Sequence, residues 1–263
     1  MDYNKFIPQL QLICEESAEF IRSHFGKIKS DQVDVKEKNS LVSFVDKESE
    51  KMITCALKQL LPESSFLTEE KMVDQKESAH TWIVDPLDGT TNFLIGVPHF
   101  AISIGLKKEG MQLGVVYDVM RGDFYHAIKG QGAFLNHTKI KVAPAKKLDE
   151  CTIATGFPYN KNLIGKGHEL ALMHYLKNAR ALRRLGAAAL DLSYVAKGNF
   201  DLYYERFLNA WDLAAGILLV TEAGGITTDM NGKQNMLEKG EIIACSKGME
   251  KEIEQIINNF TKM

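Results

Sequence analysis

Hydrophobic residues recur at helical spacing near the start of the chain. One face of this segment carries Phe6, Leu10, Ile13, Ser17 and Phe20, with acidic residues between them. Gly26 follows as a helix stop. A second broad apolar face runs through residues 47–60, and Pro62 ends it. The spacing therefore predicts two amphipathic helices before residue 62.

Between residues 64 and 142 the pattern changes to short apolar runs. These runs read SFLTE, TWIVD, FAISIGL, LGVVYDV, FYHAI and TKIKV. Most are bounded by glycine or charged turns such as KKEGM, MRGD and KGQG, which is typical of strands. Closely spaced strands joined by short turns predict an antiparallel sheet. The exception is TTNFLIGVPH, which fits a short helix.

After residue 145 strand-like and helical segments alternate. The strand-like segments are TIATGF, FDLYYE and EIIACS. The helical segments lie near 166–178, in AAALDLSYVAKG, in WDLAAGILLVTEAGG and near 248–260. This alternation predicts an α/β arrangement. We place a soft boundary at the polar stretch APAKKLDE, so that residues 1–145 and 146–263 form two halves of one compact unit.

Composition narrows the range of functions. The chain has 263 residues, a hydrophobic content of 45% and a net charge of −2, so it lacks the bulk positive field of a general nucleic-acid or membrane-surface binder. No apolar run reaches the roughly 18 residues of a membrane span. The start MDYNKFIPQL lacks the basic head and apolar core of a signal peptide. We therefore expect a cytoplasmic protein.

The four cysteines are scattered and form no CxxC pair, which argues against a zinc site. Each lies in an apolar stretch, so we expect buried, reduced thiols.

Candidate chemistry centres on WIVDPLDGTTNF, residues 82–93, where Asp85 and Asp88 stand three positions apart. The pattern predicts a buried strand, a bend at Pro86 and Gly89, and then a helix start that suits a phosphate. Two carboxylates held close repel each other unless a cation lies between them, and Mg²⁺ prefers carboxylates and phosphate oxygens. A metal site against a phosphate is one interpretation. An ordinary Asp-Pro turn explains the same residues.

Other acids support the first interpretation. Glu69 and Glu70 end the strand just before this one, and Asp212 lies in the first turn of an apolar helix. Asp46 stands just ahead of the second helix. A helix-dipole role for Asp212 and an N-cap role for Asp46 explain each residue singly. The set as a whole favours one acidic site.

These motifs closely resemble those of the inositol monophosphatase family of Mg²⁺-dependent phosphatases. WIVDPLDGTTNF, with LTEE upstream and WDLAAGILLVTEAGG downstream, matches the family in order and spacing across nearly the whole chain. Either motif alone is weak evidence, but the pair is specific. The resemblance implies a layered αβαβα sandwich, with an antiparallel N-terminal sheet and a mixed C-terminal sheet, and usually a homodimer.

The resemblance also implies the metal ligands. Glu69, Asp85 and the carbonyl of Leu87 would hold one Mg²⁺. Asp85, Asp88 and Asp212 would hold a second. A third, weaker ion would lie near Glu69, which gives two to three ions in all. The family's lysine near this ion corresponds to Lys36 or Lys38.

Further roles follow from the same resemblance. The catalytic residues would be Asp46, Glu69 and Thr90, with Thr90 and Asp46 orienting and deprotonating the attacking water. The substrate-binding residues would be Leu87, Asp88, Gly89, Thr90, Gly186, Ala187, Ala188, Glu205 and Asp212. Within this set, Gly89 and Thr90 would bind phosphate, the segment 186–188 would line the alcohol side, and Glu205 would contact inositol hydroxyls.

The expected activity is Mg²⁺-dependent, Li⁺-sensitive hydrolysis of myo-inositol 1-phosphate or a similar phosphorylated polyol. The same chemistry on 3′-phosphoadenosine 5′-phosphate, fructose 1,6-bisphosphate, histidinol phosphate or NADP stays open, because the alcohol-side residues decide the substrate. A different role, as an interaction protein for the transcription machinery, has local support only from the basic segment ARALRRLG.

Overall fold

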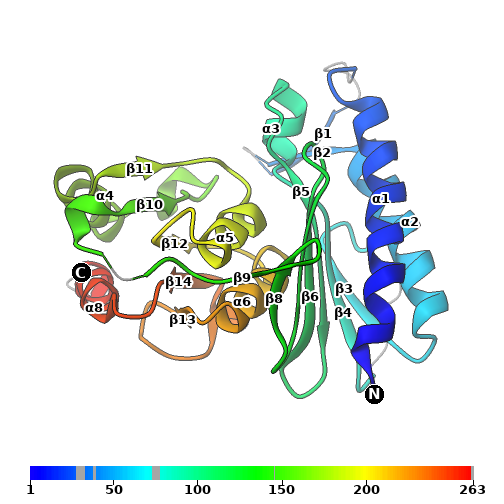
Figure 1. The fold of residues 1–263 in the computed structure, drawn as a ribbon. Helices are drawn as coiled ribbons and strands as arrows, with labels where there is room; N and C mark the ends of the chain where they lie inside the picture. Colours follow the sequence, from blue (N-terminus) through cyan, green and yellow to red (C-terminus); the bar gives the residue numbers. More distant parts are fainter. Residues whose placement is uncertain (28–32, 38–39, 73–77, 145, 262–263) are drawn as a thin grey trace.

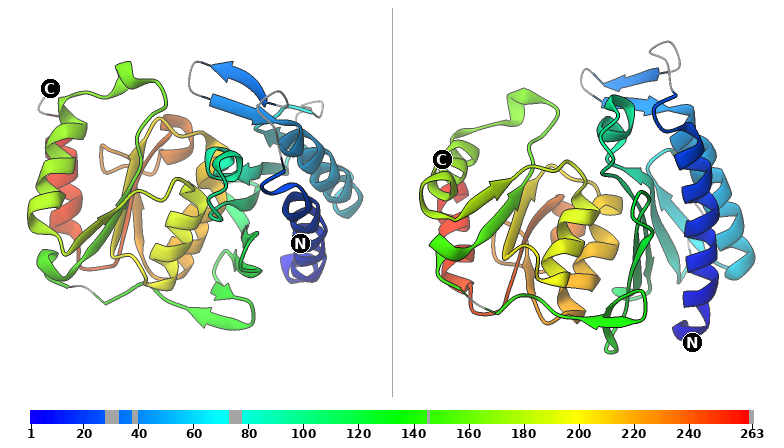
Figure 2. Two further views of the ribbon diagram at one scale, coloured as in Figure 1. Left: turned by 90° about the horizontal axis from the view of Figure 1, so that it is seen from above. Right: turned by 45° about the horizontal axis from the view of Figure 1, so that its top comes forward.

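The computed structural model describes residues 1–27, 33–37, 40–72, 78–144 and 146–261, with the backbone alone at 33–37, 40–43 and 261. Two helices, a sheet, two helices, a second sheet and two more helices follow one another across the molecule (Figure 1). Figure 2 shows the same five layers from two other directions. The layered αβαβα sandwich implied by the resemblance is therefore confirmed.

The first layer contains α1 (Ile7–His24) and α2 (Phe44–Leu60). Their buried faces pack on one face of the first sheet, as their apolar stripes predict. An antiparallel pair that the sequence did not predict, β1 (Val33–Glu37) and β2 (Ser40–Ser43), joins them. Helix α2 begins three residues earlier than the predicted start at residue 47, so Asp46 lies inside its first turn and not ahead of it.

The first sheet has the strand order β3-β4-β5-β6-β7-β8-β9 in the part of the chain that the structure describes. Its strands are β3 (Ser65–Thr68), β4 (Thr81–Asp88), β5 (Ala101–Lys107), β6 (Met111–Asp118), β7 (Asp123–Ile128), β8 (Gly132–Leu135) and β9 (Thr138–Ile140). Neighbours pair antiparallel except β3 and β4, which are parallel. The predicted short helix is α3 (Thr90–Ile95).

The middle layer consists of α5 (Ala188–Lys197) and α6 (Ala210–Glu222), which lie between the two sheets (Figure 2). Helix α6 is apolar almost throughout, because both of its sides are covered. It lies so close to β6 that a Cβ at Gly114 would be 2.8 Å from the carbonyl oxygen of Ala215. This close packing holds the middle of α6 against the first sheet.

The second sheet has the order β11-β10-β12-β14-β13 among the described residues. Its strands are β10 (Thr152–Thr155), β11 (Ala181–Arg183), β12 (Leu202–Arg206), β13 (Ile226–Thr228) and β14 (Glu241–Cys245). Strand β10 runs parallel to both neighbours, and β14 antiparallel to both of its own, so the sheet is mixed as expected. Outer helices α4 (Lys166–Asn178) and α8 (Glu250–Thr261) cover its far face. Shorter helical segments are Tyr3–Phe6, Leu148–Glu150, Lys161–Leu163 and α7 (Met236–Lys239).

Three of the four cysteines are buried free thiols as expected, but Cys55 is exposed on α2.

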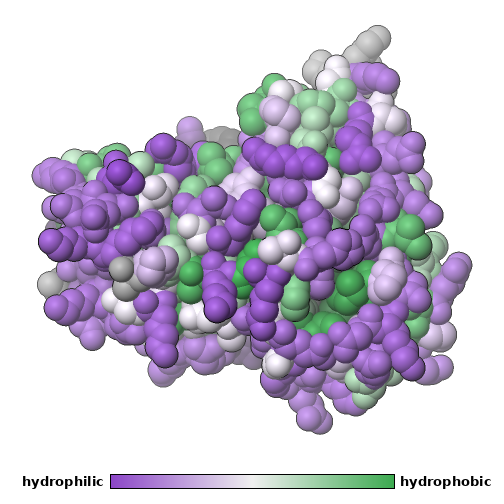
Figure 3. All heavy atoms as spheres, viewed as in Figure 1, coloured by the Kyte–Doolittle hydropathy of each residue, from purple (hydrophilic) through white to green (hydrophobic). Residues whose placement is uncertain are grey.

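No helix among the described residues is long and apolar enough to cross a membrane. The face drawn in Figure 3 is mostly hydrophilic, with hydrophobic atoms gathered between α1 and β8.

Candidate active site

A cavity of about 490 Å³ lies where the end of β4 meets the starts of α5 and α6. The predicted site residues that line it are Glu69, Asp85, Leu87, Asp88, Gly89, Thr90, Gly186, Ala187, Ala188, Glu205 and Asp212. Asp46 is buried, and its carboxylate lies 3.2 Å from the Thr90 hydroxyl. Segments far apart in the sequence therefore meet around one space.

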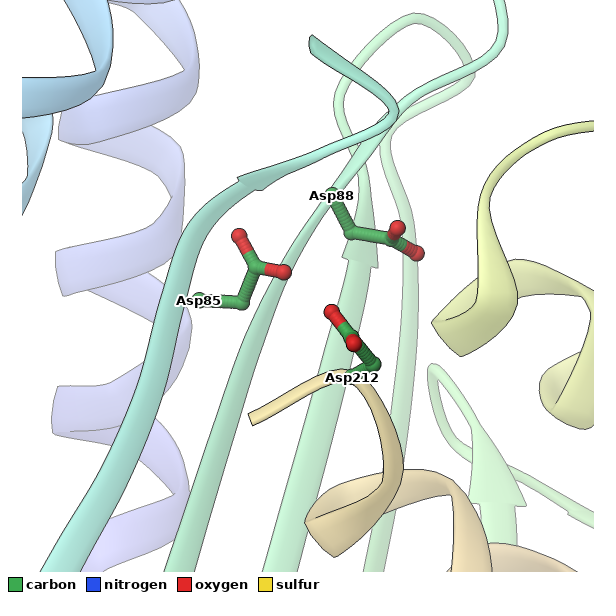
Figure 4. Close-up of side chains that lie close together, drawn as sticks. All are labelled: Asp85, Asp88 and Asp212. Carbon is green, nitrogen blue, oxygen red and sulfur yellow. The ribbon is translucent and has the colours of Figure 1, made fainter. Parts of the chain in front are cut away.

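Three carboxylates converge at one end of this cavity (Figure 4). One oxygen from each of Asp85, Asp88 and Asp212 lies within 4.8 Å of the other two. Asp85 and Asp88 belong to β4, whose pairing with β5 becomes irregular between them. At the bend that follows, Gly89 has a φ of +96° and a missing Cβ that would meet the His99 carbonyl at 3.0 Å, so only glycine fits.

Backbone N–H groups hold each of the three carboxylates. Asp85 accepts a hydrogen bond from the backbone of Leu87 at 3.0 Å, and Asp212 accepts one from Asn209 at 2.6 Å. Asp88 accepts one at 2.7 Å from the backbone of Ala189, in the first turn of α5. The carboxylate of Asp88 thereby connects the first sheet to the middle layer.

The pKa shifts of Asp85, Asp88 and Asp212, which we call the trio, are those expected of carboxylates that bind a cation. Burial raises the pKa of Asp85 well above its ordinary range, and Glu69, Asp88 and Asp212 raise it further. Burial and Asp212 likewise raise the pKa of Asp88, and burial raises the pKa of Asp212 to about 6. Buried oxygen donors that repel one another fit a hard divalent cation, which would stabilise all three ionised forms.

Thr90 and Asp46 lie beside the trio. The hydroxyl of Thr90 is 3.2 Å from Asp46 Oδ1 and 3.0 Å from the carbonyl oxygen of Leu87, so it can donate to either. A hydroxyl that touches a buried carboxylate has a route for passing on a proton.

Glu69 lies outside the close trio but lines the same cavity, and its charge acts on Asp85. Its position depends on Glu50, a fully buried carboxylate of α2 that the sequence analysis did not single out. Glu50 accepts hydrogen bonds from the Thr68 hydroxyl at 2.8 Å and from the backbones of Glu70 and Met72 at 2.7 Å. The sequence does contain a signal for Glu50. It lies four residues after Asp46, on the apolar stripe of α2, where a charged residue is unexpected.

Glu205 lines the same cavity but comes from β12 of the second sheet. The Tyr203 hydroxyl donates to its Oε2 at 2.6 Å, and a Cβ on Gly156 would lie 2.0 Å from the same oxygen, so the carboxylate rests on the Gly156 backbone. Burial raises the pKa of Glu205 to about 7, although the hydrogen bond from Tyr203 and the charge of Arg184 oppose the rise.

The segment 186–188 also lines this cavity, through small residues. It is held in place by Asn92 of α3, whose side chain donates to the carbonyl oxygens of Leu185 at 2.9 Å and His99 at 2.8 Å. We call the region around Glu205, Arg184 and residues 186–188 the alcohol end, and the region of the trio the acidic end.

Sequence reasoning did not assign Lys71, Tyr159 or Arg184 to the cavity, although all three line it. Tyr159 and Thr91 place their hydroxyl oxygens 3.2 Å apart. These residues lie in loops or at strand ends, where periodicity gives no signal. Arg184 belongs to the basic segment already noted.

The lysine that the resemblance places near a third ion is either Lys36 or Lys38. Lys38 lies outside the described residues, as does the side chain of Lys36, so the choice between them stays open.

Comparisons with known proteins find relatives across nearly the whole chain. The model of the inositol monophosphatase family matches residues 2–262. An inositol-1-monophosphatase of Mesorhizobium japonicum is 42% identical over 233 residues, which cover 86% of each chain. The Nus factor SuhB of Pasteurella multocida is 38% identical over 224 residues, 84% of each chain. The extragenic suppressor protein SuhB of Bartonella henselae has a crystal structure that superposes with a TM-score of 0.91 at 35% identity, covering 96% of this chain and 98% of that one.

Proposed function

The chain belongs to the inositol monophosphatase family, and from this premise we propose that it is a Mg²⁺-dependent phosphomonoesterase that hydrolyses myo-inositol 1-phosphate and similar monophosphates. The observation that carries the proposal is the convergence of Asp85, Asp88 and Asp212 within 4.8 Å, in a cavity that Glu205 also lines.

Asp85, Asp88 and Asp212, joined by Glu69 and the carbonyl oxygen of Leu87, would hold two to three ions. When bound, Mg²⁺ polarises the phosphate ester and lowers the pKa of water, so that no strong free base is needed. The chain's own contribution is to hold these oxygen donors rigidly through backbone hydrogen bonds from Leu87, Ala189 and Asn209.

Thr90 and Asp46 would handle the proton of the attacking water. The Thr90 hydroxyl accepts a hydrogen bond from water and passes its own proton toward Asp46 Oδ1, 3.2 Å away. The water oxygen forms a bond to phosphorus as the ester P–O bond breaks. The departing alkoxide oxygen takes a proton from solvent water, and the proton held by the Thr90–Asp46 pair returns to solvent, so the charges balance. Gly89 and Thr90 would contact the phosphate. No residue of the chain becomes phosphorylated in this scheme.

At the alcohol end, Glu205 would accept hydrogen bonds from substrate hydroxyls, which a carboxylate can do with several at once. Gly186, Ala187 and Ala188 would leave room for a ring because their side chains are small or absent. This combination favours a polyol over an apolar alcohol.

The test is phosphate release from myo-inositol 1-phosphate, fructose 1,6-bisphosphate, 3′-phosphoadenosine 5′-phosphate, histidinol phosphate and NADP, each with Mg²⁺ and with EDTA. We expect Mg²⁺-dependent release with the highest kcat/KM for the inositol ester, and inhibition by Li⁺. Preference for another ester would replace the substrate and keep the chemistry. No release from any ester would contradict the proposal.

A homodimer is part of the proposal. Helix α4 exposes Leu170, Met173 and Leu176 to 40%, 47% and 55% along one side, which a partner copy would cover. Light scattering should give twice the monomer mass of 29.5 kDa, and the monomer mass would contradict this part.

A second candidate role, interaction with the transcription machinery, is favoured by the relatives named Nus factor SuhB. An affinity pull-down with the tagged protein from its own cells tests it. Recovery of transcription proteins would support the role, and their absence at native expression would contradict it.

A further inference from the structure

Arg184 lies in the connection between β11 and α5 and lines the alcohol end of the cavity. Its side chain folds back over Gly186, since a Cβ on that glycine would lie 2.4 Å from Arg184 Nη1. Gly186 has a φ of +87°, a conformation that glycine adopts without strain. The local backbone therefore leaves space for the guanidinium beside the cavity wall.

The guanidinium of Arg184 forms no hydrogen bond or ion pair with any residue that the structure describes. An arginine carries five N–H donors in a planar fork, and in a cavity lined by acids it would ordinarily be paired. Its charge still reaches the alcohol end, because it lowers the pKa of both Glu205 and Tyr159. The donors of Arg184 are thus available to a ligand in the cavity.

The neighbouring Arg183 provides a contrast. Both arginines are exposed, but Arg183 donates from Nη1 to the carbonyl oxygen of Leu182 at 3.0 Å and does not line the cavity. The two arginines share charge, size and chain segment, but only Arg184 faces the space where a substrate would lie.

The charge of Arg184 acts on Glu205 and Tyr159, whereas the charges that act most on Asp85 and Asp88 are those of other acids. Among the described residues that line the cavity, the other basic side chain is Lys71, which follows Glu69 by two positions. The phosphate that is hydrolysed would lie at the acidic end, so a contact with Arg184 falls to the alcohol. Glu205 lies at the same end, but Tyr203 donates to its Oε2 and no hydrogen bond or ion pair joins its carboxylate to the Arg184 guanidinium in the described part of the chain.

We propose that Arg184 is a specificity-determining residue that raises kcat/KM for a phosphate ester whose alcohol carries a second anionic group, a carboxylate or a phosphate, relative to the matching ester without that group. The inference rests on the proposed function and refines its substrate class. A guanidinium recognises either group through two parallel N–H···O bonds, which a lysine cannot reproduce.

The experiment compares esters that differ by one anionic group. Glycerol 3-phosphate and 3-phosphoglycerate form the carboxylate pair, and fructose 1-phosphate and fructose 1,6-bisphosphate form the phosphate pair. For each pair the readout is the ratio of kcat/KM, anionic over neutral, with Mg²⁺. Both members are measured on one preparation, so the fraction of active enzyme cancels from the ratio.

In Arg184→Gln we expect the ratio to fall at least about tenfold for one or both pairs, the loss of a charge-assisted bidentate contact. The pair affected identifies the group recognised. Arg184→Lys should retain part of the ratio, and Arg183→Gln should leave it at the wild-type value.

An unchanged ratio for both pairs in Arg184→Gln would overturn the inference, as would an equal change in Arg183→Gln, which would indicate a general effect of surface charge. If the wild type hydrolyses myo-inositol 1-phosphate but the ratios do not move, the proposed function survives and this inference fails. If the wild type releases no phosphate from any ester with Mg²⁺, both fail.

Discussion

The two ends of the cavity are built differently. At the acidic end, Asp85, Asp88 and Asp212 each accept a backbone hydrogen bond, so their positions follow from the strands and helices themselves. At the alcohol end, Glu205 is held by one side chain, Tyr203, and Arg184 by none that the structure describes. If the proposed function holds, backbone contacts would fix the residues that do the chemistry, whereas individual side chains would set the substrate. The following predictions test that division.

The largest effect should come from Asp88→Asn. The amide keeps the shape of the side chain but removes one negative charge from the trio. The hydrogen bond from the Ala189 N–H is then made to a neutral amide instead of a carboxylate. We expect kcat with Mg²⁺ to fall at least about a thousandfold. Asp149→Asn, which removes an exposed carboxylate that does not line the cavity, is the control. Full Mg²⁺-dependent turnover in Asp88→Asn would contradict the role of the acidic end.

Stability without metal should depend on pH. Glu205 has an ordinary pKa of 4.5 and a folded pKa of about 7, so its contribution is fully present below about pH 4.5 and is lost as the pH rises through about 7. The loss is up to about 3 kcal/mol. Asp212, raised from 3.8 to about 6, acts in the same direction.

Urea denaturation in EDTA across this pH window measures the effect. Glu205→Gln should flatten the curve, and Glu150→Gln, at an exposed position, should not. Added Mg²⁺ should restore stability most at the alkaline end, because it binds ionised carboxylates. Stability that rises over the same window in EDTA would count against the buried acids as its source.

Thr90→Ala should lower kcat by about a hundredfold with little change in KM, because it removes the hydroxyl that touches Asp46. Thr90→Ser keeps the hydroxyl and should retain most of the activity. Equal activity in the alanine and serine variants would show that the hydroxyl carries no proton.

The smallest effect should appear at the alcohol end. Gly156→Ala introduces a Cβ within 2.0 Å of Glu205 Oε2 and must displace the carboxylate without removing its charge. We expect the preference for myo-inositol 1-phosphate over glycerol 2-phosphate to fall about tenfold while kcat for the smaller ester changes little. A loss of kcat on both esters would contradict the separation of roles, because it would show that the alcohol end also affects the chemical step.

The acidic end was largely predictable from local sequence patterns. At the alcohol end, Glu205 and residues 186–188 were expected only from the resemblance to the family, and Arg184 and Tyr159 were not expected. A buried strand, a Pro-Gly bend and an acid in the first turn of an apolar helix are local signals, and the structure brings Asp85, Asp88 and Asp212 together. Arg184 and Tyr159 reach the cavity through irregular segments, whose course depends on tertiary packing. No local pattern encodes such a course.

Some elements of the fold were predictable from the sequence and others were not. The long amphipathic helices and most strands of the first sheet have clear periodicity, but β11 and β13 have only three residues each, too few to show any. The parallel pairing of β3 with β4 depends on a long connection and not on either strand's composition. The early start of α2 moved Asp46 from a predicted cap into the helix.

The hydrogen bond from Ala189 to Asp88 has a consequence for how the molecule folds. Asp88 ends a strand of the first sheet, and Ala189 begins a helix that packs under the second. Neither sheet alone can complete the trio's surroundings, since Asp212 also arrives with the middle layer. During refolding, phosphatase activity should therefore return only after the two sheets have docked, later than the helical circular dichroism signal.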